Sequence, residues 1–257
     1  QRRRTGYGRR ACEDCQLSLG RRRERARIVT GSAQANLLAG KKALIMGVAD
    51  RHSLAWGIAQ AFHEQGAALA FTYQEEPRGR IERNVRQLVS TLNSQAPFPM
   101  FPCDVADDES IGRAMQGLAS EWRSLDVLAH CIAFADRDDL NRPFSEISRE
   151  GYKLAMEISA YSLNAVSRAA APLMRSSGGS IIALTYNAVE RAVPGYSAMA
   201  AAKAALELGV ELAGNGRDLD VADPPARDLG ADVGARHRGH HRHRGLSVAV
   251  ELSLEDA

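Results

Sequence analysis

Residues 42–57 read KALIMGVADRHSLAWG, and this stretch decides the fold. Its first part, Lys42–Gly47, is a short apolar run typical of a buried strand. A loop with glycine only at its ends, Gly47 and Gly57, follows, and Leu54–Gln65 has the pattern of an amphipathic helix. A strand, a glycine turn and a helix in this order predict the opening of a βαβ unit.

The same alternation continues along the chain to about Leu212. Strands that alternate with helical segments of about 12 residues or more indicate a parallel sheet. Right-handed crossovers then give an α/β, doubly wound, Rossmann-type sheet with a ligand crevice at the carboxyl ends of its strands. Further strands are predicted at Ala67–Tyr73, Phe98–Val105, Val127–Ala133 and Ser180–Thr185, and helices at Arg78–Leu92, Glu109–Trp122, Arg149–Met174 and Gly195–Leu212.

Length and composition predict one sizeable globular domain. The chain has 257 residues, of which 45% are hydrophobic, and a net charge of +2, which points to neither a nucleic-acid nor a membrane partner. No apolar run is long enough to span a membrane. Four cysteines are too few and too scattered for a disulfide framework, and no signal peptide is recognisable. We therefore expect a soluble, cytoplasmic protein with inert thiols.

Composition divides the chain into three regions, 1–36, 37–212 and 213–257. The arginine-rich first region is predicted to be a disordered or extraneous extension, with a targeting leader or nucleic-acid-binding arm as the alternative. The third region has no apolar periodicity, so we expect it to be disordered or translated out of frame, and the C-terminal strands of the sheet to be missing or replaced. We expect no metal site, because the His237–His243 cluster is interrupted by arginines and contains no carboxylate or thiolate.

The loop after the first strand is a candidate phosphate site, although it lacks the GxGxxG pattern. Gly47 permits a sharp turn, and Ser53 is placed to cap a helix that begins at Leu54. Free backbone N–H groups at that helix terminus suit a pyrophosphate. A simple capped strand-to-helix turn remains the alternative.

Polar residues at the ends of the second and third strands suit an adenosine. Gln74, with Glu75 and Glu76 after it, suits ribose hydroxyls and repels a 2′-phosphate, which favours NADH over NADPH. Asp104, followed by Val105, is placed to accept a hydrogen bond from the adenine amino group. Asp104 could instead cap the following turn.

Five ordered segments resemble the enoyl-acyl-carrier-protein reductases, a divergent branch of the short-chain dehydrogenase/reductase superfamily. They are GVADRHSLAWGIAQAFHEQGAALAFTYQ, CDVADDESI, HCIAFA, REGYKLAMEISAYS and YNAVERAVPGYSAMAAAK, and they run from Gly47 to Lys203. In place of the superfamily's usual Tyr-x-x-x-Lys, Lys203 follows Tyr196 by seven residues, which is the spacing of this branch. Seven residues are about two helical turns, so both side chains share one face. A second tyrosine, Tyr186, precedes Tyr196 by ten residues, as in that family.

The resemblance implies a site for NADH and an enoyl thioester. Tyr196, Tyr186 and Lys203 would be catalytic. The residues implied to contact the dinucleotide are Gly47, Ser53, Leu54, Gln74, Asp104, Val105, Ile132 and Lys203, and those implied to border the substrate are Ala135 and Met199. The family further implies an acyl-carrier-protein partner and a homotetramer. Ala133 departs from the family's usual glycine, and the family's segment after the catalytic helix is not recognisable.

The implied reaction is the conjugate reduction of a trans-2-enoyl thioester in fatty acid elongation. Tyr196 would hydrogen-bond the thioester oxygen as negative charge develops. Lys203 would lower the pKa of Tyr196 by its charge and bind the nicotinamide ribose. Two alternatives remain: a carbonyl reductase of the same superfamily, and an inactive fragment that at most binds a dinucleotide.

Overall fold

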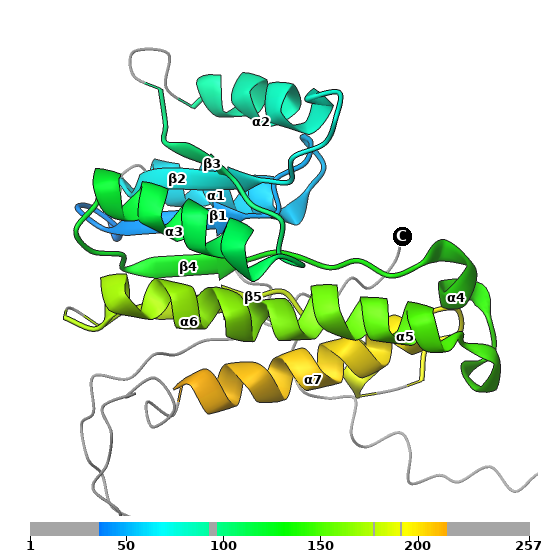
Figure 1. The fold of residues 1–257 in the computed structure, drawn as a ribbon. Helices are drawn as coiled ribbons and strands as arrows, with labels where there is room; N and C mark the ends of the chain where they lie inside the picture. The colour runs from blue at the N-terminus through cyan, green and yellow to red at the C-terminus, as the bar shows by residue number, and fades with distance from the viewer. Residues whose placement is uncertain (1–35, 93–96, 177, 191, 215–257) are drawn as a thin grey trace, which may run out of the picture. The chain divides into compact units, whose positions relative to one another are not determined.

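The computed structural model describes residues 36–92, 97–176, 178–190 and 192–214 of the chain. Their strands form one sheet in the order β3-β2-β1-β4-β5, and all neighbouring strands are parallel (Figure 1). The predicted doubly wound α/β fold is therefore confirmed. The strands are β1 (Lys42–Met46), β2 (Ala68–Tyr73), β3 (Met100–Pro102), β4 (Val127–His130) and β5 (Ser180–Ala183).

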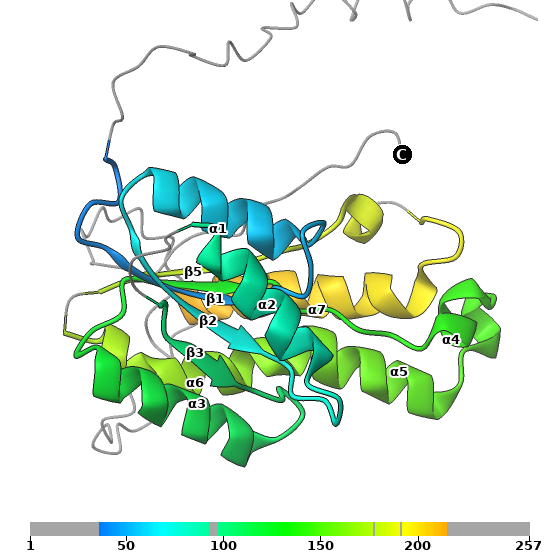
Figure 2. The ribbon, with the colours of Figure 1, turned by 90° about the horizontal axis from the view of Figure 1, so that it is seen from above.

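Helices cover both faces of this sheet. Figure 2 shows α1 on one side and α3 with α6 on the other. The helical segments are α1 (Leu54–Glu64), α2 (Arg80–Ser90), α3 (Asp108–Glu121), α4 (Arg137–Asn141), η2 (Phe144–Glu146), α5 (Arg149–Met156), η3 (Glu157–Tyr161), α6 (Ser162–Met174), η4 (Asn187–Val189) and α7 (Ser197–Gly214).

Successive residues of the strands enter two separate apolar layers. In β1, Ala43 and Ile45 pack in the layer that α1 and α2 cover, whereas Leu44 and Met46 pack in the layer that α3, α6 and α7 cover. All four side chains are at most 1% exposed. A parallel sheet buried on both faces needs such a continuous apolar run, which is why KALIM has no polar alternation.

The bounds of most predicted elements agree with the observed ones to within two residues, and three elements differ more. The strand predicted at 98–105 is reduced to Met100–Pro102. The N–H of Cys103 still bonds to the carbonyl of Tyr73, but the side chain of Asp104 then forms a turn with Ala106 and the pairing with β2 ends. The strand predicted at 127–133 ends at His130. The helix predicted at 149–174 is continuous, but its middle, Glu157–Tyr161, is π-helical. The short segments α4 and η2 were not predicted.

Several predictions lie outside the described residues. They concern the arginine clusters with Cys12 and Cys15 before residue 36, and the region after residue 214 with its histidines and the expected loss of strands. Within the described part, no helix is long and apolar enough to cross a membrane. The same part holds no group of three His, Cys, Asp or Glu residues that could bind a metal ion.

Candidate active site

The site lies where the strand order reverses. β2 and β4 flank β1, and the connections after β1 and β4 lead to helices on opposite faces of the sheet, so a crevice is expected at the carboxyl ends of these two strands. Gly47 follows β1 with φ +88°, and a Cβ placed there would lie 2.0 Å from the carbonyl oxygen of Cys131, which follows β4. Only glycine allows the two loops to approach so closely.

The loop from Gly47 to the start of α1 leaves the helix terminus without a side-chain cap. Ser53 occupies the N-cap position, as predicted, but its hydroxyl donates to the carbonyl of Asp50 at 2.6 Å. The prediction that the Ser53 side chain caps α1 is wrong, because its oxygen accepts no hydrogen bond from the N–H groups of the helix and the hydroxyl is oriented toward the Asp50 turn instead. Ser53, Leu54 and Ala55 line a cavity, and the helix terminus remains suited to an anion.

A first cavity, the Gln74 cavity, extends over the ends of β1, β2, β3 and β4 and has a volume of about 390 Å³. Of the predicted cofactor residues, it is lined by Gly47, Gln74, Asp104, Val105 and Ile132. The Oδ1 atom of Asp104 accepts a hydrogen bond from the N–H of Ala106 at 3.0 Å. Asp104 therefore forms the turn that was weighed as its alternative role, while it also borders the cavity.

A second cavity, the Lys203 cavity, has a volume of about 270 Å³. It shares Gly47, Cys131, Ile132 and Ala133 with the Gln74 cavity, so the two cavities adjoin along the β1 and β4 loops. Of the predicted residues, it is lined by Gly47, Ser53, Leu54, Ile132, Tyr186, Tyr196 and Lys203. All three predicted catalytic residues thus face one space.

The two tyrosines of the Lys203 cavity are in ring contact. The ring centroids of Tyr186 and Tyr196 lie 4.9 Å apart with an interplanar angle of 59°. Burial raises the pKa of Tyr196 above its ordinary value, and the neighbouring Tyr186 raises it further. The prediction that Lys203 lowers this pKa is wrong: the loss of hydration outweighs any effect of the ammonium, and Tyr196 keeps its proton at neutral pH.

Lys203 is 4% exposed and hydrogen-bonded to the backbone. Its Nζ donates to the carbonyl of Leu184 at 2.6 Å, just beyond the end of β5. Burial lowers the pKa of Lys203 to about 8. The side chain is therefore a cation at pH 7, held in place by a strand end and able to donate to a ligand in the cavity.

The two predicted substrate residues, Met199 and Ala135, lie in or against an apolar cluster that Tyr196 also contacts. Met199 is 5% exposed and belongs to a small apolar cluster with Ala155, Ala198 and Ala202. Ala135 and Tyr196 pack against this cluster. Neither Met199 nor Ala135 lines either cavity, so their contact with a substrate remains a prediction.

Comparison with known proteins identifies the family. The family model described as enoyl-(acyl carrier protein) reductase matches residues 47–215. This chain belongs to that family. It is 48% identical over 173 residues to the enoyl-acyl-carrier-protein reductase (NADH) FabI of Nostoc sp., covering 67% of this chain and 66% of that protein. The FabI of Bacillus cereus is 47% identical over 179 residues, covering 70% and 68%.

Solved structures of this reductase family show the same fold. The Bacillus cereus enoyl-acyl carrier protein reductase with NADP⁺ and indole naphthyridinone has a TM-score of 0.67 at 46% identity, covering 70% of this chain and 68% of that one. The Anaplasma phagocytophilum reductase in complex with NAD has a TM-score of 0.66 at 40% identity, covering 71% and 68%. This chain thus spans about two thirds of the length of these reductases.

Polar residues that support the candidate site were not predicted from the sequence. His130, at the end of β4, is fully buried, and its Nε2 lies 2.8 Å from the Oγ of Ser162. Thr185, which lines the Lys203 cavity, donates to Glu207 of α7. Ser159 forms hydrogen bonds to the backbone of Phe134, in the loop after β4. Glu207 follows Lys203 by one helical turn, which is the one signal in the sequence that could have identified a supporting residue.

Two cysteines, the buried Cys103 and the half-buried Cys131, line the site without being reactive. Burial raises the pKa of Cys103 to about 11 and that of Cys131 to about 12. Because the thiolate is the nucleophilic form, both cysteines are poor nucleophiles at neutral pH. This agrees with the inert thiols predicted for the reductase.

Proposed function

We propose that this chain reduces trans-2-enoyl thioesters of acyl-carrier protein with NADH, in fatty acid elongation. The observation that carries the proposal is the single cavity that Tyr196, Tyr186 and Lys203 line together with Gly47 and Ile132. The relatives named as NADH-dependent enoyl-acyl-carrier-protein reductases support the same activity. We place the protein in the cytoplasm, where the acyl-carrier-protein substrate is expected.

The crevice fits a dinucleotide. A Cβ at Gly47 would fill the close approach of the β1 and β4 loops, which is the kind of cradle that lets a backbone contact a pyrophosphate. Gln74, Asp104 and Val105 would hold the adenosine, Ser53 and Leu54 the pyrophosphate, and Ile132 and Lys203 the nicotinamide riboside. Bound NADH supplies a hydride to the β-carbon of the enoyl thioester.

The protein's own residues would manage the charge that develops on the thioester oxygen. Tyr196 has a raised pKa, so its hydroxyl remains protonated and donates a hydrogen bond to that oxygen. The Lys203 ammonium, fixed by the Leu184 carbonyl, would bind the ribose hydroxyls and set the position of the nicotinamide. Tyr186 packs on the ring of Tyr196 and restricts its orientation.

A substrate comparison tests this function. The purified full chain is mixed with NADH and either crotonyl-coenzyme A or simple ketones, and the loss of nicotinamide absorbance is followed. We expect oxidation of NADH with the enoyl thioester and none with the ketones. Turnover of ketones alone would replace the proposal with carbonyl reduction, and binding of NADH without oxidation by either substrate would refute catalysis by this chain.

The pH dependence of the reaction should follow Lys203. Its pKa of about 8 predicts that kcat/KM for NADH, which reports groups of the free enzyme, falls about tenfold per pH unit above about pH 8. This loss of activity above about pH 8 would not be caused by an effect of Lys203 on folding. The folded-state pKa lies below the ordinary value of 10.5, so this group makes stability rise with pH between about 8 and 10.5. Steady-state rates from pH 6 to 9.5 check the prediction, and a flat profile would contradict it.

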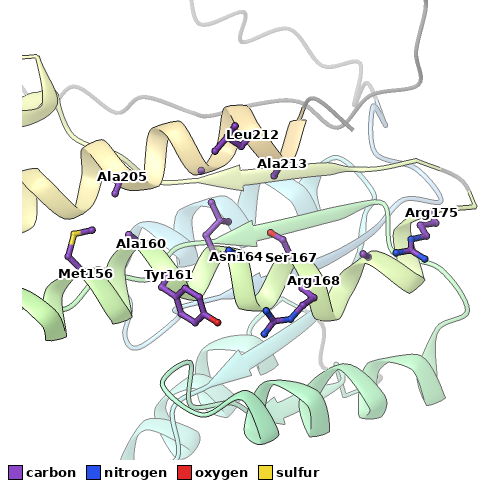
Figure 3. Close-up of a pocket in the computed structure, with 13 residues that line it drawn as sticks. Met156, Ala160, Tyr161, Asn164, Ser167, Arg168, Arg175, Ala205, Leu212 and Ala213 are labelled. Atoms are coloured by element: carbon purple, nitrogen blue, oxygen red, sulfur yellow. The ribbon is translucent and has the colours of Figure 1, made fainter. Parts of the chain in front are cut away.

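We further propose that the chain assembles as a homotetramer through α6 and α7. A groove of about 480 Å³ lies between these helices, and Figure 3 shows side chains of both helices around it. Tyr161, at the end of η3 and directly before α6, and Leu208 and Leu212 of α7 are 48%, 57% and 50% exposed. Large apolar side chains gathered at exposed positions favour a protein partner. Sedimentation equilibrium tests this, since a monomer at all concentrations would refute it.

A further inference from the structure

A π-helical turn interrupts the long helical segment that faces the end of β4. This turn, Glu157–Tyr161, lies between α5 and α6. Such turns are rare, and they occur frequently at functional sites because the wider turn changes the direction of the side chains. Here the turn contains Ser159 and is followed directly by Ser162, and both residues are fully buried.

The hydroxyl of Ser159 both accepts a hydrogen bond from the backbone of Phe134 and donates one to it. Its Oγ accepts a hydrogen bond from the N–H of Phe134 at 2.9 Å and donates to the carbonyl of Phe134 at 2.9 Å. Phe134 follows β4 by four residues and has an exposed side chain. The backbone of the loop after β4 is therefore attached, at Phe134, to the buried side chain of Ser159 in the π-helical turn.

Ser162 holds the other end of the same loop. Its Oγ donates to the carbonyl of Ile158 at 2.7 Å, so its lone pairs accept from the Nε2–H of His130 at 2.8 Å. Burial, and the charge of Lys203, lower the pKa of His130 to about 3, so its ring is neutral. His130 and Phe134 flank the segment Cys131–Ala133, which is thus held at both ends by one helical region.

That segment forms the wall shared by the two cavities. Cys131, Ile132 and Ala133 line both the Gln74 cavity and the Lys203 cavity, and the Cys131 carbonyl touches the position that a Cβ of Gly47 would occupy. We propose that Ser159 is a positioning residue, whose hydroxyl sets the place of this wall against the nicotinamide and the enoyl group. The inference rests on the proposed function.

Ser159→Ala tests the inference by removing both hydrogen bonds to Phe134. We expect kcat with crotonyl-coenzyme A to fall about tenfold or more, because small displacements at a reacting centre are costly. The Kd of NADH should change less than about threefold, since the residues of the Gln74 cavity that hold the adenosine are untouched. Ser159→Cys leaves no cavity and replaces the hydroxyl by a slightly larger, weakly hydrogen-bonding thiol, so it should show the same loss in a protein that still folds.

Ser167→Ala is the matched control. Ser167 lies on α6, is 4% exposed, and its Oγ has no hydrogen-bond partner among the described residues. We expect its kcat to equal that of the wild type. If Ser159→Ala and Ser159→Cys turn over within about twofold of Ser167→Ala, or if kcat and NADH affinity fall together with the melting temperature, Ser159 does not position the site.

Amide hydrogen exchange separates this inference from the proposed function. The N–H of Phe134 should exchange at least about tenfold faster in Ser159→Ala than in Ser167→Ala, with and without NADH. If the wild type does not reduce the thioester but this difference is seen, the proposed function fails and the attachment of the loop stands. Equal exchange in the two variants would overturn the inference, whatever the activity.

Discussion

Tyr196→Phe is expected to lower kcat for crotonyl-coenzyme A by about 10²-fold, the magnitude typical for the loss of one donor to a developing oxyanion. The substitution removes one hydroxyl and keeps the tilted ring contact with Tyr186, whose centroid lies 4.9 Å away. Because Lys203 and the Gln74 cavity are untouched, the Kd of NADH should stay within about twofold of the wild type. Single-turnover rates and NADH titration by fluorescence measure the two quantities separately.

Two other tyrosines serve as comparisons. Tyr152 lies on α5 and is 39% exposed, so Tyr152→Phe should leave turnover unchanged. Tyr186→Phe keeps the ring contact with Tyr196, so its effect should be smaller than that of Tyr196→Phe. Turnover by Tyr196→Phe at the wild-type rate would remove this hydroxyl from the reaction.

Gly47→Ala is expected to destabilise the fold by about 3–5 kcal/mol, which combines an unfavourable backbone conformation with overpacking. The new Cβ would lie 2.0 Å from the Cys131 carbonyl oxygen at a φ of +88°. Neither the end of β1 nor that of β4 can move without disturbing the buried ladder between them. NADH binding should be lost as well, because the added Cβ occupies the close approach at Gly47 that would let the backbone contact the pyrophosphate.

Gly57→Ala is the matched comparison for denaturant unfolding. Gly57 lies in the first turn of α1, the helix that follows this loop, and has nothing within 4 Å of an added Cβ. We expect this variant to be as stable as the wild type or about 0.5–1 kcal/mol more stable, since alanine favours a helix. If the two alanine variants unfold at the same denaturant concentration, the close approach at Gly47 is not a constraint.

The sequence was most informative where a local pattern decides the structure. The apolar run of β1 predicts a strand buried on both faces, and Ala43–Met46 fill two opposite layers. The π-helical turn could not be predicted from EISAY, because the bonds of Ser159 join residues 25 positions apart. The early end of β4 depends on the same tertiary contacts, so an apolar run alone extended that strand too far.

In the candidate site, too, some features could be predicted from the sequence and others depend on tertiary structure. The resemblance predicted Tyr196, Tyr186 and Lys203 at their positions, and the structure brings them to one cavity. The pKa of Tyr196 was predicted to be lowered, but it is raised. Burial is the largest cause of this shift, and the spacing of two residues does not show burial. The Ser53 cap was also predicted wrongly, because the spacing of residues does not show how the hydroxyl is oriented, and the Asp50 turn orients it without a bond from the N–H groups of α1.

The proposed enoyl reduction is tested most directly by following the transferred hydrogen. The full chain is incubated with crotonyl-coenzyme A and NADH that carries deuterium at both C4 positions, and the product is examined by mass spectrometry. The account predicts a butyryl thioester with one deuterium on its β-carbon for each NADH oxidised. Unreacted crotonyl thioester, or reduction without deuterium at the β-carbon, would contradict it.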